Sequence, residues 1–299
     1  MKKISLVFLL LCSALLFGCS GKEDGEMPTV TKQSEQSGTD NKNAVSNEKE
    51  NITEEIIDLS NYFNGIKGCA VIYNPIENTC YFYNEDLAKQ EASPYSTFKI
   101  ISALAGIHNN VIKDETSTMN YNGTQYPNLE WNKNLTLKEA FQTSCIWYFR
   151  QVVNAVGKNE IQNELNELDY GNKDISEWEG SNINPYEELN GFWLNSSLKI
   201  SPLQQVKVLE KIFDGQSIYS SQEIETVKEI MLIQNDETQK IYGKTGSGSN
   251  GEAWFVGFIQ TNDQRIYLAT YLSDLSKSGE ISGSTAKEIS LKIINDKMD

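Results

Sequence analysis

The stretch PYSTFKIISALAGI, residues 94–107, is apolar on nearly all sides after its first turn, which predicts a buried helix. Positions i and i+3 share one helix face, so we expect the Ser96 hydroxyl and the Lys99 amine within hydrogen-bond reach. Pro94 places Ser96 near the helix N-terminus, where free N–H groups and the dipole favour developing negative charge. Burial also lowers the pKa of a lysine and leaves a useful neutral amine.

The Ser-x-x-Lys spacing is weak evidence alone, because it also begins at Ser46, Ser196 and Ser284. What strengthens it is a second motif, KTG at residues 244–246, which follows a predicted strand. A lysine and a hydroxyl on an edge strand can bind a substrate carboxylate, while glycine lets the backbone come close. The stretch SCI at residues 144–146 offers a further hydroxyl from a region predicted to be helical.

Hydrophobic periodicity predicts an α/β (α+β) fold with a central antiparallel sheet built from both ends of the chain. Helices flank the sheet, and a helical subdomain is inserted between its two halves. The predicted strands are 67–73, 79–84, 239–243, 253–259 and 265–271. The predicted helices are 54–62, 96–107, 135–168 with a break at Gly157, 202–213, 222–233 and 281–295, and residues 170–200 are loop-rich.

The first fifty residues differ in composition from the rest. Lys2 and Lys3 precede an apolar run over 4–17, and LFGC at 16–19 resembles a bacterial lipobox in which Cys19 becomes lipidated. Residues 20–51 have no aromatic side chain and read as a flexible polar spacer. We therefore expect a leader over 1–19, the spacer over 20–51 and one catalytic domain over 52–299. The expected location is the outer face of the bacterial cytoplasmic membrane, as a secreted lipoprotein.

Composition excludes several classes of function. The net charge is −15 and Arg150 and Arg265 are the only arginines, so nucleic acid is not an expected partner. The single histidine, His108, follows an apolar run and reads as a helix C-terminal residue, which argues against a histidine-based zinc centre or triad. Three cysteines of the folded part, Cys69, Cys80 and Cys145, are expected as free thiols.

Five ordered motifs, spread over roughly residues 60–295, resemble those of the class D (oxacillinase-type) serine β-lactamases. They are PYSTFK at 94–99, SCI at 144–146, YGN at 170–172, FWL at 192–194 and KTG at 244–246. The resemblance implies the serine β-lactamase and penicillin-binding-protein fold, and a reaction on β-lactam small molecules through a serine acyl-enzyme.

The resemblance also implies catalytic roles. Ser96 would be acylated, and Lys99 would be carboxylated on its ε-nitrogen by CO₂ and act as general base. Trp193 would donate its indole N–H to that carboxylated lysine. Ser144, beside Lys244, would relay a proton to the lactam nitrogen. No metal and no cofactor besides CO₂ or bicarbonate is expected.

The substrate-binding positions implied by the resemblance lie on three segments. The backbone N–H groups of the nucleophile and of Ser247 would form the oxyanion hole. Thr245 and Gly246 would line the substrate strand, and Ile146 and Leu194 would wall the carboxylated lysine and control water access. YGN at 170–172 is expected to shape a loop rather than to catalyse.

One departure from the family concerns carboxylate recognition. Class D enzymes usually carry an arginine in the last helical region, and residues 283–288 contain none. We infer that Thr245 and Ser247, with Ser284 or Lys287, share the task of binding a substrate carboxylate.

Two other readings stay open. A penicillin-binding transpeptidase shares the same serine and lysine motifs but does not need a carboxylated lysine beside Trp193. A β-lactam sensor domain would be acylated without turnover, and such sensors follow several membrane-spanning helices, whereas this sequence has one short apolar segment. The chain is expected to be a monomer or a homodimer.

Overall fold

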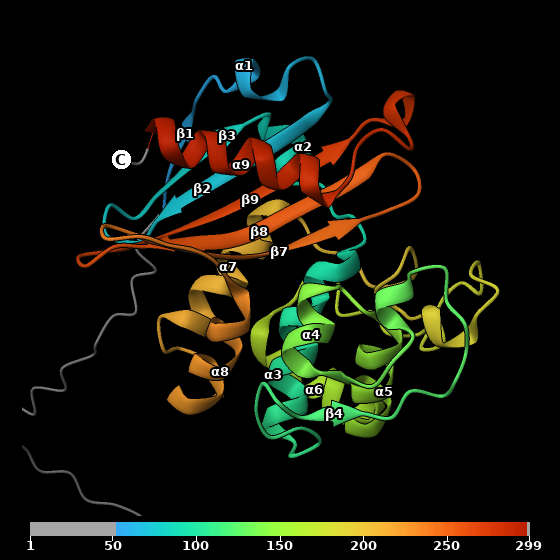
Figure 1. The fold of residues 1–299 in the computed structure, drawn as a ribbon. Helices are drawn as coiled ribbons and strands as arrows, with labels where there is room; N and C mark the ends of the chain where they lie inside the picture. Colours follow the sequence, from blue (N-terminus) through green and yellow to red (C-terminus); the bar gives the residue numbers. More distant parts are fainter. Residues whose placement is uncertain (1–51, 298–299) are drawn as a thin grey trace, which may run out of the picture. The chain divides into compact units, whose positions relative to one another are not determined.

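A seven-stranded sheet organises the computed structural model, which describes residues 52–297 (Figure 1). All neighbouring strands are antiparallel except β1 and β3, which are parallel. Because β2 pairs with β9, strands from the two ends of the domain meet within the sheet, as the sequence predicts. In spatial order the strands are β1 (Thr53–Ile56), β3 (Thr79–Tyr83), β2 (Gly68–Asn74), β9 (Arg265–Ser273), β8 (Glu252–Gln260), β7 (Lys240–Ser247) and β6 (Leu232–Asn235).

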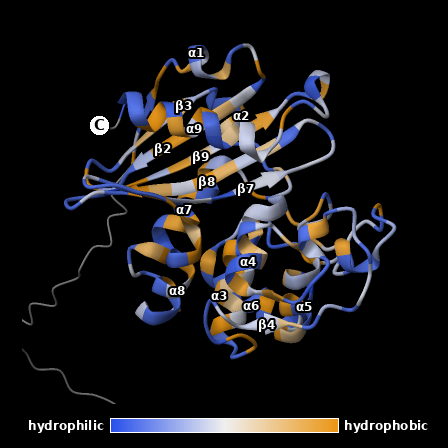
Figure 2. Cartoon of the chain, viewed as in Figure 1, coloured by the Kyte–Doolittle hydropathy of each residue, from blue (hydrophilic) through white to orange (hydrophobic). Residues whose placement is uncertain are grey.

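The central strands of the sheet are buried on both faces, which explains their apolar sequences. All of β2 is buried, and successive side chains of a strand point to opposite faces. Cys69, Val71 and Tyr73 belong to the core on the helical side, whereas Ala70 and Ile72 belong to the core on the other side. A strand with two buried faces is apolar throughout, and Figure 2 shows this as a largely apolar central sheet.

Helices cover the two faces unequally. On one face lie α9 (Gly283–Lys297) and the short α1 (Ser60–Phe63), with α9 packed on β7, β8 and β9. On the other face α7 (Pro202–Phe213) packs on β2, β8 and β9, and the short α2 (Glu85–Ala88) packs on β2 and β3. The remaining helices extend away from this face (Figure 1). These are α3 (Lys99–His108), α4 (Leu137–Gln142), α5 (Ile146–Val156), α6 (Lys158–Leu168) and α8 (Ser221–Met231), with a small ribbon of β4 (Thr118–Met119) and β5 (Leu135–Thr136).

The predicted fold class is confirmed, with corrections at the edges of the sheet. The predicted helix 54–62 is wrong over its first half, because residues 53–56 form β1 and a helical turn begins only at Ser60. All four residues of β1 are exposed, so no alternation marks the strand. The predicted helix 222–233 ends at Met231 and is followed by β6. The parallel pairing of β1 with β3 also means that the sheet is not purely antiparallel.

The cysteine prediction is confirmed. Cys69, Cys80 and Cys145 are buried free thiols, and Cys80 lies opposite Tyr73 in the hairpin. The expected leader, Cys19 and the spacer over 20–51 lie outside the described residues.

The N-terminus of α7 is closed by a capping box. Ser201 Oγ accepts a hydrogen bond from the Gln204 N–H at 3.1 Å, and Gln204 Oε1 accepts one from the Ser201 N–H at 2.8 Å. We expect Ser201→Ala to lower the free energy of unfolding by about 1 kcal/mol, because the cap is lost. The melting temperature should fall by about 2–4 °C. The control Ser221→Ala, at an exposed first position of α8, should change stability by less than about 0.5 kcal/mol. Equal effects of the two changes would contradict this account.

Candidate active site

Ser96 and Lys99 lie together at the start of the buried helix. Ser96 belongs to a 3-10 turn, η1 (Tyr95–Phe98), and Lys99 is the first residue of α3. The helix therefore begins as a 3-10 turn rather than as the α-helix that the sequence predicts at Ser96. The predicted contact is nevertheless present, with Lys99 Nζ 2.7 Å from Ser96 Oγ. Ser96 is half-buried, whereas Lys99 has 0% of its surface exposed.

The surroundings of Lys99 favour a neutral amine. Burial, and next the charge of the nearby Lys244, hold the pKa of Lys99 well below its usual value, with an opposing contribution from the Cys145 thiol. The ring of Phe149 lies 5.7 Å from Lys99 Nζ, and no ion pair to Lys99 is present among the described residues. An uncharged lysine beside a serine hydroxyl can serve as a base or as a nucleophile.

Ser144 and Lys244 form a second pair. Lys244 Nζ lies 3.0 Å from Ser144 Oγ and 3.0 Å from the Thr245 carbonyl oxygen. Burial lowers the pKa of Lys244 to about 7, so this amine titrates near neutral pH. Ser144 sits in the break between α4 and α5 with a φ of 56°, a left-handed conformation uncommon for a residue other than glycine. The break turns the hydroxyl toward β7, a feature that periodicity alone does not predict.

Trp193 supplies a buried donor that has no acceptor. Its indole Nε1 is buried and has no hydrogen-bond partner. Its ring contacts Phe98, with centroids 5.6 Å apart, and Phe192, with centroids 5.0 Å apart. Ile146 and Leu194, predicted to wall the lysine, are both half-buried. An unpaired buried N–H costs free energy, so this indole is suited to a polar group that joins the pocket.

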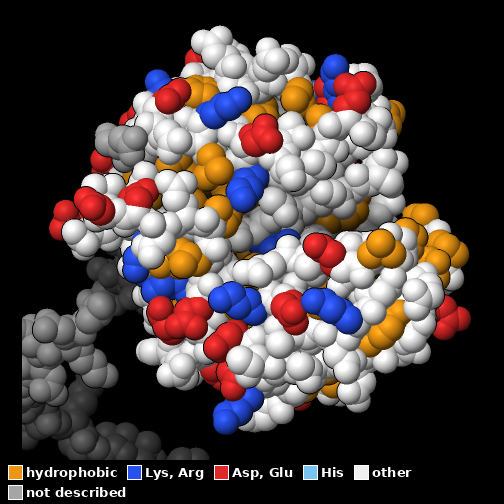
Figure 3. Space-filling model, in the orientation of Figure 1, with side chains coloured by type: hydrophobic (Ala, Val, Ile, Leu, Met, Phe, Trp, Pro, Cys, Tyr) orange, Lys and Arg blue, Asp and Glu red, His pale blue; other side chains and the backbone are white. Residues whose placement is uncertain are grey.

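The substrate strand borders a cleft. The motif at 244–246 lies inside β7, not after it as the sequence predicts. The pairing of β6 with β7 ends at Tyr242, and the neighbouring hollow of about 280 Å³ is lined by Lys244, Thr245 and Lys287 among others. In Figure 3 a furrow runs between the sheet and the helical region.

The end of β7 is held closely by its neighbours. A Cβ on Gly246 would lie 3.1 Å from the Pro94 carbonyl oxygen, so glycine lets this strand approach the nucleophile turn. Ser247 Oγ accepts a hydrogen bond from the Gly283 N–H at 2.9 Å, which ties the strand to the start of α9. Ser284, one candidate for carboxylate binding, is exposed, whereas Lys287 lines the cleft.

Sequence reasoning missed Tyr95, which links three distant segments. Its φ is 49°, its N–H donates to the Trp193 carbonyl oxygen at 3.0 Å, and its hydroxyl donates to Glu252 at 2.6 Å. Glu252 also accepts from the Tyr271 hydroxyl at 2.7 Å. No local pattern signals these contacts, because they join residues that are remote in the sequence.

The motif at 170–172 holds a loop, in keeping with its predicted structural role. Asn172 Nδ2 donates to the Ser197 carbonyl oxygen at 2.9 Å, and the Lys199 N–H donates to Asn172 Oδ1 at 3.0 Å. His108 ends α3, and its Nδ1 lies 3.2 Å from a Glu223 carboxylate oxygen. It is therefore held at the opposite end of α3 from Lys99.

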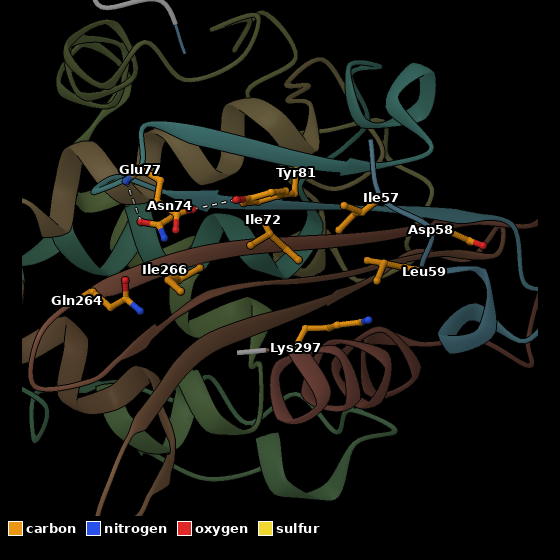
Figure 4. Close-up of a pocket in the computed structure, with 10 residues that line it drawn as sticks. All are labelled: Ile57, Asp58, Leu59, Ile72, Asn74, Glu77, Tyr81, Gln264, Ile266 and Lys297. Carbon is orange, nitrogen blue, oxygen red and sulfur yellow. Dashed lines mark hydrogen bonds between the residues drawn. The ribbon is translucent and has the colours of Figure 1, made fainter. Parts of the chain in front are cut away.

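A second hollow, of about 580 Å³, lies on the α9 side of the sheet (Figure 4). Ile72, Tyr81 and Ile266 contribute apolar side chains, and Asp58 and Lys297 contribute charges. None of its lining residues belongs to the two serine–lysine pairs, so this hollow is separate from them.

Residues 52–297 contain no cluster of three or more metal-binding side chains. Within the same range, no helix has the length and apolar character needed to cross a bilayer.

The profile of the penicillin binding protein transpeptidase domain matches residues 30–294. The regulatory protein BlaR1 of Staphylococcus aureus is 35% identical over 81% of this chain and 40% of its own length. The probable β-lactamase YbxI of Bacillus subtilis is 30% identical over 80% of this chain and 84% of its own length.

A solved structure is also similar. The C-terminal domain of the Bacillus licheniformis BlaR penicillin receptor matches with a TM-score of 0.73 and 31% identity, over 82% of this chain and 96% of that one. The chain spans about two-fifths of the length of the regulatory proteins it matches.

The lowered pKa of Lys244 predicts how stability depends on pH. The folded-state pKa is about 7, whereas an unfolded lysine titrates near about 10.4. Between these values the unfolded state binds more protons, so the free energy of unfolding should rise as pH rises from 7 to 10. The pKa of Lys99 is also lowered, so Lys99 too should make the free energy of unfolding rise over this pH range. Urea unfolding in CO₂-free buffer should show this rise, and Lys244→Met should reduce it.

A matched control is Lys133→Met, since the Lys133 side chain is 58% exposed. This variant should keep the rise of the wild-type protein. A Lys244→Met protein with an undiminished rise would show that the Lys244 amine titrates as an ordinary lysine.

Proposed function

The chain belongs to the penicillin-binding protein transpeptidase-domain family, and from that premise we propose that it hydrolyses β-lactam antibiotics through an acyl-enzyme on Ser96. The observation that carries the proposal is the fully buried Lys99 amine, 2.7 Å from Ser96 Oγ, in a core that also contains the unpartnered N–H of Trp193. β-Lactamases are among the relatives of similar length.

The first step activates Lys99. Its neutral amine attacks the carbon of CO₂, an N–C bond forms, and one proton leaves to solvent, so the side chain becomes a carbamate anion. Burial supports the neutral amine that this step requires. Trp193 would then donate its N–H to the new anion, which would satisfy a buried donor without a charged partner.

Acylation and hydrolysis follow from the two serine–lysine pairs. Lys99 in its carboxylated form accepts the proton of Ser96, and Ser96 Oγ bonds to the lactam carbonyl carbon. The lactam C–N bond breaks, and Ser144 delivers a proton to the departing nitrogen and recovers one through Lys244, while carboxylated Lys99 gives up the proton it took from Ser96 to this pair. Water then enters past Leu194, loses a proton to carboxylated Lys99, and bonds through its oxygen to the acyl carbon. The ester C–O bond breaks, Ser96 Oγ takes that proton, and the product acid leaves.

Substrate binding is proposed to use the open edge of β7. Backbone N–H groups of Ser96 and Ser247 would stabilise the oxyanion. Thr245 and Lys287 line the hollow beside β7 and would bind the substrate carboxylate. Gly246 would let the substrate backbone approach, and Ile146 would exclude water until the acyl-enzyme has formed.

A second candidate is a β-lactam sensor that is acylated without turnover. The 35% identity to BlaR1 of Staphylococcus aureus favours it, and the same serine–lysine pair would serve its acylation. A transpeptidase is a further alternative within the family. The three differ in the fate of the acyl-enzyme.

The N-terminal region completes the proposal. We propose that residues 1–19 act as a secretory leader, that Cys19 is lipidated, and that residues 20–51 tether the catalytic domain outside the cytoplasmic membrane. In that location the enzyme would meet β-lactams before they reach the cell-wall enzymes.

Turnover separates hydrolysis from sensing. Mixed with a chromogenic cephalosporin at neutral pH in the presence of bicarbonate, the protein should convert many substrate equivalents. Ser96→Ala should lose essentially all activity, because the nucleophile is gone, while keeping its melting temperature. A single stoichiometric burst without further turnover, even with bicarbonate added, would favour the sensor or the transpeptidase.

The donor role of Trp193 predicts a change in carboxylation. Trp193→Phe keeps an aromatic ring but removes the N–H, so ¹³CO₂ labelling of Lys99 should fall by about tenfold, in line with the loss of a hydrogen bond to a charged group. Carbon-13 NMR of the carbamate signal measures it. The control Trp147→Phe removes an indole N–H that bonds the Trp131 carbonyl oxygen instead, and it should leave labelling intact. Full labelling of the Trp193→Phe protein would disprove the donor role.

A further inference from the structure

The loop that carries Trp193 has little regular secondary structure. Between Tyr170 and Ile200 the structure shows one short 3-10 turn, η3 (Glu187–Leu189), and no helix or strand. A segment of this kind takes its shape from side-chain anchors rather than from a backbone ladder. The position of the Trp193 indole therefore depends on what fastens the loop to the rest of the domain.

Arg150 on α5 is one such anchor. Its side chain is 4% exposed. Arg150 Nη1 donates to the Trp178 carbonyl oxygen at 2.7 Å, and Nη2 contacts the carboxylate of Glu179. The guanidinium carbon also lies 5.7 Å from the centre of the Trp178 ring. One buried cation thus holds two successive residues of the loop.

The anchored turn is in direct contact with Trp193 through aromatic rings. The Trp178 ring stacks on Phe192, with centroids 5.1 Å apart and an interplanar angle of 22°. Phe192 in turn meets Trp193 edge-on at 5.0 Å. Such ring pairs have preferred geometries, so a shift of Trp178 is transmitted to the indole.

The backbones of the two turns also touch. A Cβ built on Gly180 would lie 2.4 Å from the Gly191 nitrogen, and Gly180 has a φ of +83°. Ser196, three residues after Trp193 in the sequence, donates from its Oγ to the Glu177 carboxylate at 2.6 Å. The turn held by Arg150 and the turn that carries Trp193 therefore form one packed unit.

The same helix reaches the lysine. Phe149, adjacent to Arg150, places its ring 5.7 Å from Lys99 Nζ. We propose that Arg150 is a positioning residue that fixes the Trp193 indole for the carboxylation of Lys99, an inference that rests on the proposed function. Arg150 touches neither the substrate nor the reacting atoms and acts through Trp178 and Phe192.

The chemistry of the contact calls for arginine. A guanidinium offers a planar fork of donors, which reaches a carbonyl and a carboxylate at once, whereas an ammonium is a compact point charge. The Glu179 side chain is 72% exposed, so its carboxylate partners the buried cation from the solvent side. A lysine at this position would keep the charge but could not contact the Trp178 carbonyl oxygen and the Glu179 carboxylate with a planar pair of donors.

The test measures how β-lactam hydrolysis by the Arg150→Met protein depends on bicarbonate concentration. We expect the bicarbonate concentration for half-maximal β-lactam hydrolysis to rise by about tenfold or more, because a displaced indole binds the carboxylated lysine less well. The ¹³C signal of carboxylated Lys99 should fall at low bicarbonate, and the maximal rate at saturating bicarbonate should recover toward that of the wild-type protein. A merely structural role would lower the melting temperature without changing the bicarbonate requirement.

Arg265→Met is the matched control. Arg265 makes the same kinds of contact elsewhere, with the Phe213 carbonyl oxygen, with Asp214 at 2.5 Å and over the Phe258 ring at 5.2 Å. This variant should lose thermal stability and keep the wild-type bicarbonate requirement. An equal rise of that requirement in both variants would overturn the proposal.

The labelling of the wild-type protein separates failure of the proposed function from failure of the role of Arg150. If the wild-type protein shows no ¹³C label on Lys99, the proposed function and the role of Arg150 both fail. If the wild-type protein is labelled and Arg150→Met is labelled equally at every bicarbonate concentration, only the role of Arg150 fails. Should Arg150→Met not fold, Arg150→Lys takes its place. A smaller rise in the bicarbonate requirement is then expected, and an unchanged requirement overturns the proposal.

Discussion

The site depends on the complete removal of water from Lys99. A lysine in water is charged at neutral pH and inert as a base, but burial disfavours the charged form. The second lysine, Lys244, acts in the same direction, because two ammonium groups cannot be close neighbours in a dry core. The roles proposed for Ser96, for the aromatic walls and for the indole of Trp193 all require that the Lys99 amine is neutral before it reacts with CO₂.

Several residues around Lys99 adopt conformations or environments that are unfavourable in free energy. Tyr95, which precedes the nucleophile, and Ser144, which carries the second hydroxyl, both adopt left-handed backbone conformations. A buried lysine and an unpartnered indole N–H add to that cost. The central strands of the sheet, buried on both faces, supply the stability that offsets these costs. Strain of this kind collects at functional sites and persists where the surrounding structure over-determines it.

Much of the fold follows from local patterns. The 3.6-residue periodicity predicts α7 with its observed bounds, and alternating β-branched and aromatic residues predict the β2–β3 hairpin. The predicted strands near the C-terminus cover the first half of β7 and most of β8 and β9. The failures occur where local pattern is absent, as in the exposed edge strand β1. The motifs predict which side chains share the site, but not the 3-10 turn at Ser96 or the contacts of Tyr95 and Arg150. Those arise from packing between segments that are far apart in the sequence.

The most direct test is the titration of the Lys99 side chain itself. Protein labelled with ¹³C at the lysine ε-carbon, with the Lys99 signal assigned by its absence in Lys99→Met, is followed by NMR from pH 6 to 11 in CO₂-free buffer. Our account predicts a midpoint well below that of an ordinary lysine, and a distinct new signal on addition of bicarbonate. A Lys99 signal that titrates near about 10.4, like a lysine in water, and ignores bicarbonate would contradict it.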